Sequence, residues 1–124
     1  MALELRDAGW DVSVIDEREE ALGRLGADWA GGFHVGQGID LQLLREAGID
    51  DADAVVVATD GDNTNIVIGQ VAQKMFDIPS VVIRVLDPAR AEFYSSRGLN
   101  VVCPTSSAIK TFTDAVRSFE GALR

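Results

Sequence analysis

The chain contains very little cysteine and histidine, with one residue of each in a length of 124 residues. A single cysteine cannot form an internal disulfide, which is typical of proteins from a reducing cytoplasm. One cysteine and one histidine also leave no His/Cys cluster for zinc and no Cys–His pair for nucleophilic catalysis. We therefore interpret Cys103 and His34 as strand residues.

Basic residues and long apolar runs are scarce as well. The 11 Lys and Arg are outnumbered by 20 Asp and Glu, which gives a formal net charge of −9, and such a surface repels the phosphates of nucleic acids. Apolar runs such as 54–58 and 81–83 are far shorter than the ~20 residues needed to span a bilayer. The N-terminus lacks the basic and apolar regions of a signal peptide. We expect no nucleic-acid partner, no membrane insertion and no secretion.

Short apolar runs alternate along the chain with segments of helical periodicity. Hydrophobic residues make up 47% and charged residues 25%, which predicts a globular protein, and the length suits one domain with one core. The alternation indicates βα units and a parallel sheet, so the predicted fold class is α/β. Strands are predicted at Asp11–Ile15, Gly32–Val35, Ala54–Ala58, Val81–Val85 and Asn100–Cys103. Helices are predicted at Ala2–Ala8, Glu17–Leu25, Asp40–Ala47, Asn63–Phe76, Pro88–Ser96 and Ser106–Phe119.

Polar residues follow two of the predicted strands. Asp16 closes the first of them, and the strand Ala54–Ala58 runs directly into the loop Thr59–Asn63. Ligands of open parallel sheets bind beyond the carboxyl ends of the strands, where an acidic residue can bind a ribose and a polar loop offers backbone N–H groups. We therefore expect Asp16 and the segment Ala58–Asp60 to line one nucleotide-binding cleft. The alternative for Asp16 is a helix N-cap, a position that Asp favours.

Six segments of the chain form a series with a fixed order and spacing: Val-Ile-Asp-Glu-Arg at 14–18, Leu-Arg-Glu-Ala-Gly-Ile at 44–49, Asp-Ala-Asp-Ala-Val-Val-Val-Ala-Thr at 51–59, Asp-Asn-Thr-Asn at 62–65, Arg-Val-Leu-Asp-Pro at 84–88 and Gly-Leu-Asn-Val-Val-Cys-Pro at 98–104. Over about residues 2–105 this series resembles the KTN (TrkA-N) domain. That domain is the nucleotide-binding N-terminal domain of Trk/Ktr-type potassium-uptake regulators and RCK channel gates.

The resemblance implies a Rossmann-like fold that binds NAD(H) or an adenine nucleotide such as ATP or ADP. It also implies a homodimer or higher ring that acts on a membrane potassium transporter or channel subunit, and so a cytoplasmic protein held at the inner face of the membrane through its partner. Residues 1–105 would form the nucleotide-binding domain. Residues 106–124 would form a C-terminal helix available for a dimer contact.

The resemblance further assigns binding roles to single residues. It implies that Arg18 lies over the adenine or ribose, that Gln37 and Gly38 border the adenine, and that Arg84 reaches the nucleotide or a neighbouring subunit. No catalytic or metal-binding residue is expected. The residues expected to bind the cofactor are Asp16, Glu17, Arg18, Gln37, Gly38, Ala58, Thr59, Asp60, Asn65 and Arg84.

Several of these residues have a structural alternative. The glycines of the Gly36–Gly38 segment can serve only a tight turn, and Asn65 can be an ordinary residue of a helix start. A charge inside the apolar strand Val81–Val85 is costly unless it is paired or lies at a cleft, so Arg84 can also be explained by an ion pair with Asp87 or Glu92.

The KTN family usually opens with a strand and a Gly-x-Gly-x-x-Gly turn, and Met1 falls just after that turn. In the strand order 3-2-1-4-5-6 the first strand is central, so both Val12–Ile15 and Ala54–Ala58 would lose a neighbour. Each unpaired buried backbone group costs about 1–3 kcal/mol, against ~5–15 kcal/mol for a whole domain. We therefore expect a start about 20 residues upstream, or closure of the gap by rearrangement or a partner, and weak nucleotide binding by the present chain.

Two helices carry apolar surfaces with different predicted burial. The helix from Asn63 should be largely buried, because apolar residues form two neighbouring rows along it. The last helix has a single apolar stripe, which can pack on its own sheet or on a second copy of the chain. The two rows are Val67, Val71 and Met75, then Ile68, Ala72 and Phe76; the stripe is Ile109, Phe112, Val116 and Phe119.

The sequence thus predicts a regulatory nucleotide-binding domain and no enzyme. One alternative is a fragment of an NAD-dependent dehydrogenase, although no catalytic domain accompanies the nucleotide-binding pattern. Another is a response-regulator-like phosphoacceptor domain, because Asp60 closely follows a strand. Such a domain needs a paired acidic site and a lysine at a later strand end, whereas Arg84 lies inside its strand.

Overall fold

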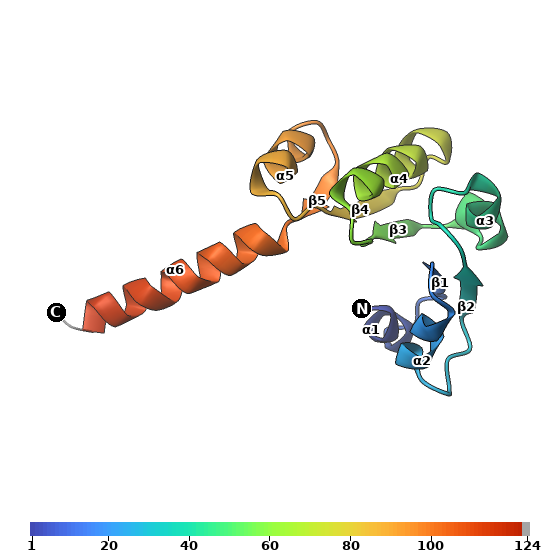
Figure 1. Cartoon of the computed structure of the whole chain (residues 1–124), viewed down its shortest axis with the longest axis horizontal. Helices are drawn as coiled ribbons and strands as arrows, with labels where there is room; N and C mark the ends of the chain where they lie inside the picture. Colours follow the sequence, from blue (N-terminus) through green and yellow to red (C-terminus); the bar gives the residue numbers. More distant parts are fainter. Residues whose placement is uncertain (123–124) are drawn as a thin grey trace. The chain divides into compact units, whose positions relative to one another are not determined.

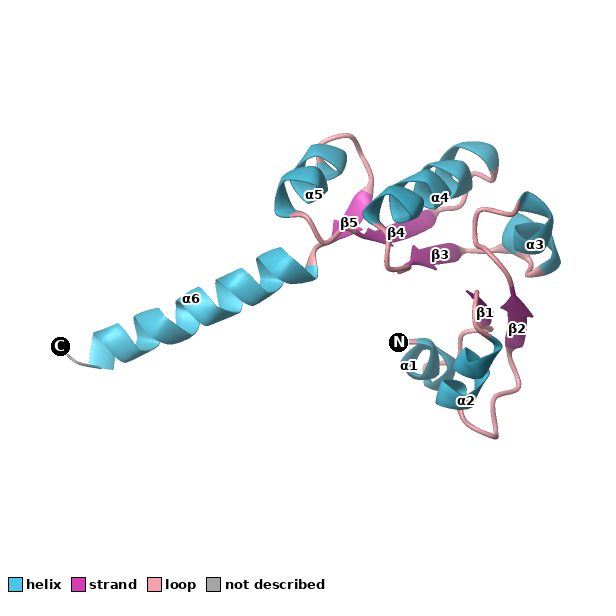
Figure 2. Ribbon diagram, in the orientation of Figure 1, coloured by secondary structure: helices cyan, strands magenta, loops and turns pink. Residues whose placement is uncertain are grey.

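The computed structural model describes residues 1–122, which form two compact units, Met1–Ala52 and the residues described from Asp53 onward. Each unit has its own parallel sheet with helices beside it (Figures 1 and 2). The backbone hydrogen bonds of each sheet join strands of one unit alone.

The first unit is built on a pair of parallel strands. Ser13 pairs with Gly32 at one end of the ladder and Asp16 with Val35 at the other. A Cβ on Gly32 would lie 2.2 Å from Ser13 Oγ, so a side chain there would force the Ser13 hydroxyl to move. The elements are α1 (Ala2–Asp7), β1 (Ser13–Asp16), η1 (Glu19–Ala21), α2 (Leu22–Leu25), β2 (Gly32–Val35), α3 (Leu41–Glu46) and η2 (Ile49–Asp51).

The second unit contains three parallel strands in the order β3-β4-β5. In this register Val57 lies beside Ile83, and Ile83 beside Val101. The elements are β3 (Ala54–Val57), α4 (Asp62–Met75), β4 (Ser80–Arg84), α5 (Pro88–Ser95), β5 (Asn100–Val102) and α6 (Pro104–Ala122). The predicted α/β class with parallel strands and flanking helices is confirmed, and the short helix η2 is the element that the sequence did not predict.

Helix α4 covers one face of the second sheet. It approaches β4 so closely at Gly69 that an added Cβ would lie 2.5 Å from Ile83 Cγ2. Ile83 and Ala72 are fully buried here, whereas Val67 is 41% and Met75 57% exposed. The prediction that both apolar rows of α4 are buried is therefore wrong for the row of Val67. A helix packed on a sheet turns one side toward the core and leaves the next row at the edge of the contact.

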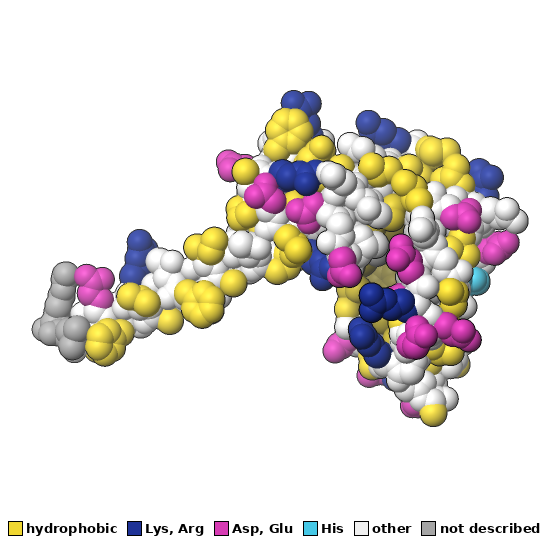
Figure 3. Space-filling model, viewed as in Figure 1, with side chains coloured by type: hydrophobic (Ala, Val, Ile, Leu, Met, Phe, Trp, Pro, Cys, Tyr) yellow, Lys and Arg dark blue, Asp and Glu magenta, His cyan; other side chains and the backbone are white. Residues whose placement is uncertain are grey.

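Helix α6 buries none of its residues among those described. Its apolar stripe is 56–72% exposed, and Figure 3 shows hydrophobic side chains spaced along the helix. The stripe consists of Ile109, Phe112, Val116 and Phe119. The sequence left open whether this helix packs on its own sheet or on a second copy of the chain. In the structure α6 does not pack on its own sheet. No helix within residues 1–122 is both long and apolar enough to cross a membrane.

Candidate functional site

The predicted binding residues fall into two groups, one in each unit. Within each unit, segments that are distant in sequence lie together at the carboxyl ends of the strands. The first unit holds Asp16, Glu17, Arg18, Gln37 and Gly38; the second holds Ala58, Thr59, Asp60, Asn65 and Arg84.

In the first unit, Asp16 is the last residue of β1 and is partly buried. Its Oδ1 accepts a hydrogen bond from the backbone N–H of Arg18 at 2.8 Å. The helix η1 begins only at Glu19, and Arg18 is its N-cap without a side-chain capping bond. Asp16 therefore closes a turn ahead of the helix and does not cap it, which corrects the N-cap alternative.

The Gly36–Gly38 segment begins directly beside Asp16, because the N–H of Gly36 donates to the Asp16 carbonyl oxygen at 2.9 Å. A Cβ on Gly36 would lie 2.6 Å from Leu43 Cδ2, so the close packing of α3 accounts for this glycine. The other end of the segment is fixed by Asp40, which caps α3 by accepting from Gln42 N at 3.0 Å. The structure thus brings the loop that contains Gln37 and Gly38 to the end of β1 beside Asp16, while Glu17, Arg18 and Gln37 are exposed.

In the second unit, the side chain of Asn65 organises the end of β3. It is 1% exposed, and its Oδ1 accepts from the backbone N–H of Thr59 at 2.9 Å and from the Thr59 hydroxyl. Its Nδ2 donates to the carbonyl oxygens of Thr59 at 3.1 Å and Arg84 at 2.9 Å. All of the hydrogen-bonding capacity of this amide is used inside the protein. Asn65 therefore holds the loop after β3 in place.

Arg84 lies beside the same loop, because the register that pairs Val57 with Ile83 puts the next residue of β4 against the end of β3. One terminal nitrogen of its guanidinium donates to the carbonyl oxygens of Ala58 at 3.2 Å and Thr59 at 2.8 Å. It also lies 3.8 Å from a carboxylate oxygen of Asp60, which is fully exposed. The alternative ion pair with Asp87 or Glu92 was wrong, since the acidic neighbour of Arg84 is Asp60.

Asp62 is a residue of this region that the sequence did not single out. It is the first residue of α4, and its two carboxylate oxygens accept the backbone N–H groups of Leu86 at 2.8 Å and Asp87 at 3.1 Å. The hydrogen bond from Leu86 is the largest influence and lowers the pKa of the Asp62 carboxyl, although desolvation opposes it. The available signal was an acidic residue at a helix start just after a strand end.

The start of α5 is connected to the start of α4 by further side chains. Asp87 caps α5 by accepting the backbone N–H of Arg90 at 3.0 Å. The guanidinium of Arg90 in turn donates to the side-chain oxygen of Asn63. The charge of Arg90 also helps to lower the pKa of Asp62. The first turns of the two helices and the loops before them therefore share one network of hydrogen bonds.

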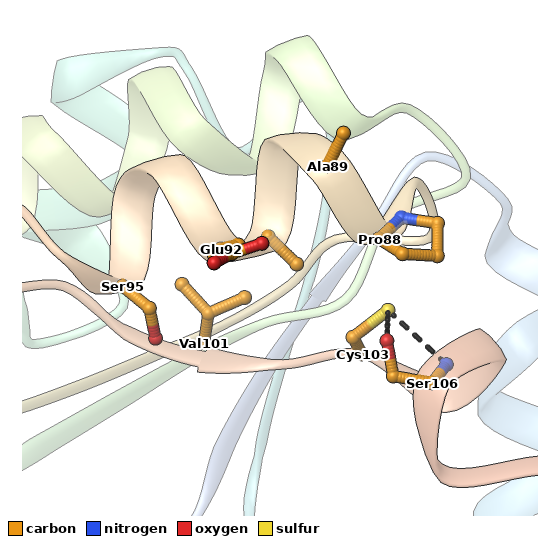
Figure 4. Close-up of a pocket in the computed structure, with 8 residues that line it drawn as sticks. Pro88, Ala89, Glu92, Ser95, Val101, Cys103 and Ser106 are labelled. Atoms are coloured by element: carbon orange, nitrogen blue, oxygen red, sulfur yellow. Dashed lines mark hydrogen bonds between the residues drawn. The ribbon is translucent and has the colours of Figure 1, made fainter. Parts of the chain in front are cut away.

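Two surface hollows in the second unit lie apart from the predicted binding residues. In the larger, of about 510 Å³, Cys103 Sγ accepts from the N–H and the hydroxyl of Ser106 at 3.5 and 3.3 Å (Figure 4). It is lined by Pro88, Ala89, Ala91, Glu92, Ser95, Val101, Cys103 and Ser106. The other, of about 460 Å³, is lined by Gln70, Gln73, Lys74, Tyr94, Arg97 and Leu99. Residues 1–122 contain no group of three or more His, Cys, Asp or Glu side chains arranged to hold a metal ion.

Solved structures identify the class of fold. The chain superposes on the structure of the GsuK RCK domain with a TM-score of 0.76 and 24% identity, over 95% of this chain and 25% of that one. It superposes on the NAD(P)-binding domain of an exopolyphosphatase-related protein from Archaeoglobus fulgidus with a TM-score of 0.71 and 22% identity, over 94% and 87% of the two chains. The protein therefore has a Rossmann-like α/β fold.

The sequence comparison identifies the family. The TrkA-N domain matches residues 1–105, and the chain belongs to this family. A Trk system potassium uptake protein TrkA from Streptomyces coelicolor is 38% identical over 114 residues, which cover 92% of this chain and 49% of that protein. The corresponding TrkA from Mycobacterium tuberculosis H37Rv is 30% identical over 103 residues, or 82% and 46%. The chain thus spans about half the length of these curated relatives, and the predicted family is confirmed.

Proposed function

We propose that this chain is a regulatory domain that binds an adenine nucleotide, NAD(H) or ATP/ADP, and thereby controls potassium movement through a separate membrane transporter or channel. Membership of the TrkA-N family supports the connection with potassium transport. The observation that carries the nucleotide proposal is the placement of polar groups at the carboxyl ends of parallel strands, with Asp16 ending β1 and the Thr59 loop following β3.

The first unit offers polar groups suited to an adenosine. Oδ1 of Asp16 is engaged by Arg18 N, and within the described residues Oδ2 has no partner, so it can accept a ribose hydroxyl. Glu17 and Arg18 are exposed next to it, and Gln37–Gly38 would border the adenine.

The second unit offers, in its loop after β3, groups suited to a phosphate. Thr59, Asp60 and Gly61 lie between β3 and α4, where a helix N-terminus favours an anion. The N–H of Thr59 is held by Asn65 and that of Gly61 by the Thr59 hydroxyl, so the N–H of Asp60 and the first turn of α4 would be the backbone donors. Arg84 and Ala58 would complete this part of the site, with the guanidinium already positioned on the loop carbonyls. Asn65 would act through Thr59, because its own amide is buried and fully hydrogen-bonded.

Regulation would require paired chains whose arrangement depends on the ligand. The 19-residue helix α6 exposes its apolar stripe, and a second copy of the chain would remove that surface from water. A two-fold dimer is the commonest closed assembly, and rings can be built from such pairs. A nucleotide that binds one arrangement more tightly shifts the population toward it, and no chemical step is needed. Through its membrane partner the protein would lie at the cytoplasmic face of the membrane.

Calorimetry with NADH, ATP and ADP on the full-length protein tests the nucleotide proposal, with Asp16→Ala as the site variant. Loss of a charged hydrogen-bond partner should weaken binding by about 1–3 kcal/mol. Asp11→Ala, which removes an exposed carboxylate just before β1, is the matched control and should bind as the wild type does. Two results would refute this site: the wild type binds none of the three nucleotides, or the Asp16→Ala variant binds each of them as tightly as the wild type does.

A further inference from the structure

We propose that Asp62 is a positioning residue that couples the Thr59–Gly61 loop to helix α5, so that a ligand held by the loop changes the start of α5. This inference rests on the proposed nucleotide function, and it names the contacts through which ligand binding at the loop would affect another part of the protein. It concerns contacts within the second unit alone.

The carboxylate of Asp62 connects two loops that are distant in sequence. It belongs to α4, directly after the Thr59–Gly61 loop, yet both of its oxygens accept N–H groups of the segment between β4 and α5. Hydrogen bonds to an ionised acceptor are shorter and stronger than neutral ones, and two of them to successive residues fix the orientation of the carboxylate. The recipient segment is Leu86–Asp87, and Asp87 is itself the N-cap of α5.

The loop is fixed to the same helical turn that carries Asp62. Asn65 stands three residues after Asp62, so both side chains arise from the first turn of α4. The amide of Asn65 binds both the N–H and the carbonyl of Thr59, as well as the carbonyl of Arg84. A displacement of the loop must therefore move the first turn of α4, and the turn carries the carboxylate that holds Leu86 and Asp87.

The coupling depends on an ionised carboxylate with two acceptor oxygens. Asparagine at this position offers one acceptor oxygen and turns an NH₂ group toward the second backbone N–H, so at least one of the two bonds is lost. Arg90 and Arg84 favour the charged form of Asp62 through their own charges. The nearby carboxylate of Asp87 is occupied by the N–H of Arg90. The substitution Asp62→Asn thus removes the connection with a minimal change of shape.

The test is amide NMR of the full-length protein titrated with ADP or NADH. In the wild type, the amides of Thr59–Gly61 and those of the first turns of α5 should shift with one midpoint. In Asp62→Asn the loop amides should still shift, whereas the α5 response should be lost. Asp62→Glu, which keeps the charge, should restore part of the α5 response. The control Glu92→Gln removes an exposed carboxylate from α5 itself and should respond as the wild type does.

Two results of the titration would overturn the coupling. The first is an α5 response in Asp62→Asn equal to that of the wild type. The second is loss of the loop shifts in Asp62→Asn, which would mean that Asp62 acts on binding itself. If the wild type binds neither nucleotide, the proposed function fails, and the coupling is then decided by hydrogen exchange without ligand.

Hydrogen exchange separates a local role of Asp62 from a coupling role. Asp62→Asn should speed exchange at the amides of Leu86 and Asp87, whose bonds are broken. Coupling also predicts faster exchange at Thr59, whose N–H is bonded to Asn65 and not to Asp62. Unchanged exchange at Thr59 would reduce Asp62 to a local structural role. If Asp62→Asn fails to fold, Asp62→Glu must exchange faster at Thr59 than the wild type does for the coupling to stand.

Discussion

The guanidinium of Arg84 donates a hydrogen bond to the carbonyl oxygen of Thr59 at 2.8 Å, across 25 residues of sequence. The same nitrogen also reaches the carbonyl of Ala58. Arg84, which the sequence suggested as a ligand contact, thus also hydrogen-bonds the backbone just after β3. Both roles depend on the same side chain.

Replacing Arg84 should therefore reduce stability as well as any nucleotide affinity. Arg84→Met keeps the apolar stem and removes the guanidinium donor from the carbonyls of Ala58 and Thr59, of which the latter keeps its hydrogen bond from Asn65. Since the side chain is one third exposed and water can replace part of the contact, we expect a loss of about 1–2 kcal/mol in the free energy of unfolding. Urea unfolding measures this loss. Arg117→Met on the exposed helix α6 is the control, and equal losses in the two variants would contradict a structural role for Arg84.

Asn65→Asp should be strongly destabilising despite its nearly identical shape. The substitution removes the Nδ2 donor, so the carbonyl of Arg84 loses its hydrogen bond from Asn65, the carbonyl of Thr59 keeps only that from Arg84, and a charge is placed at a buried position. Leaving buried groups unsatisfied costs about 1–3 kcal/mol each. Thermal or urea unfolding provides the measurement, and Asn100→Asp at an exposed position of β5 is the control. A variant as stable as that control would show that the Asn65 network contributes little.

The stability of the protein should depend on pH through Asp62. Its pKa in the folded state is lowered from the ordinary value of 3.8, chiefly by the hydrogen bond from Leu86. A lowered folded-state pKa means that the contribution is fully present above the unfolded value and is lost as the pH falls through the folded value. Unfolding free energies of the wild type measured between about pH 6 and pH 3 should therefore converge with those of Asp62→Asn at the acid end. A constant difference between the two proteins across this range would argue against the lowered pKa.

The 124-residue chain should bind NADH and ADP weakly. Its glycine pair at Gly36 and Gly38 is followed by Leu41 where a Gly-x-Gly-x-x-Gly turn has its third glycine, so the usual backbone donors for a phosphate are not supplied there. In the proposed site the loop after β3 is then the remaining phosphate contact, so ADP should bind only slightly more tightly than adenosine. Calorimetry that finds NADH bound at low micromolar strength would show that this loop holds the phosphates without a glycine turn.

Self-association should depend on the stripe of α6. Phe112 is 72% exposed, so Phe112→Asp should leave the free energy of unfolding of the chain nearly unchanged while it converts dimers to monomers at micromolar concentration. Sedimentation velocity measures the distribution of species. Ser118→Asp adds the same charge on the opposite side of the helix and should leave the dimer intact. A wild type that sediments as a monomer would refute this assembly.

The sequence by itself determined the order and type of most elements. The alternation of short apolar runs with helical segments predicted β2 at Gly32–Val35 as found, and placed the other strands within two residues of their observed limits. These patterns depend on neighbouring residues, because the spacing of apolar side chains along a strand or a helix fixes which of them share a face. The same local signals carried the resemblance to the TrkA-N family, which the family comparison confirms.

The tertiary structure decided which partners the polar residues have. The sequence could not distinguish Asp60 from Asp87 as the acidic neighbour of Arg84, because the answer depends on the register between β3 and β4. It could not show that the amide of Asn65 joins Thr59 to Arg84, or that Asp62 binds Leu86, since these contacts join segments 19 and 24 residues apart. It also left open whether α6 packs on its own sheet. That choice depends on competition between surfaces, which appears only when the chain is folded in three dimensions.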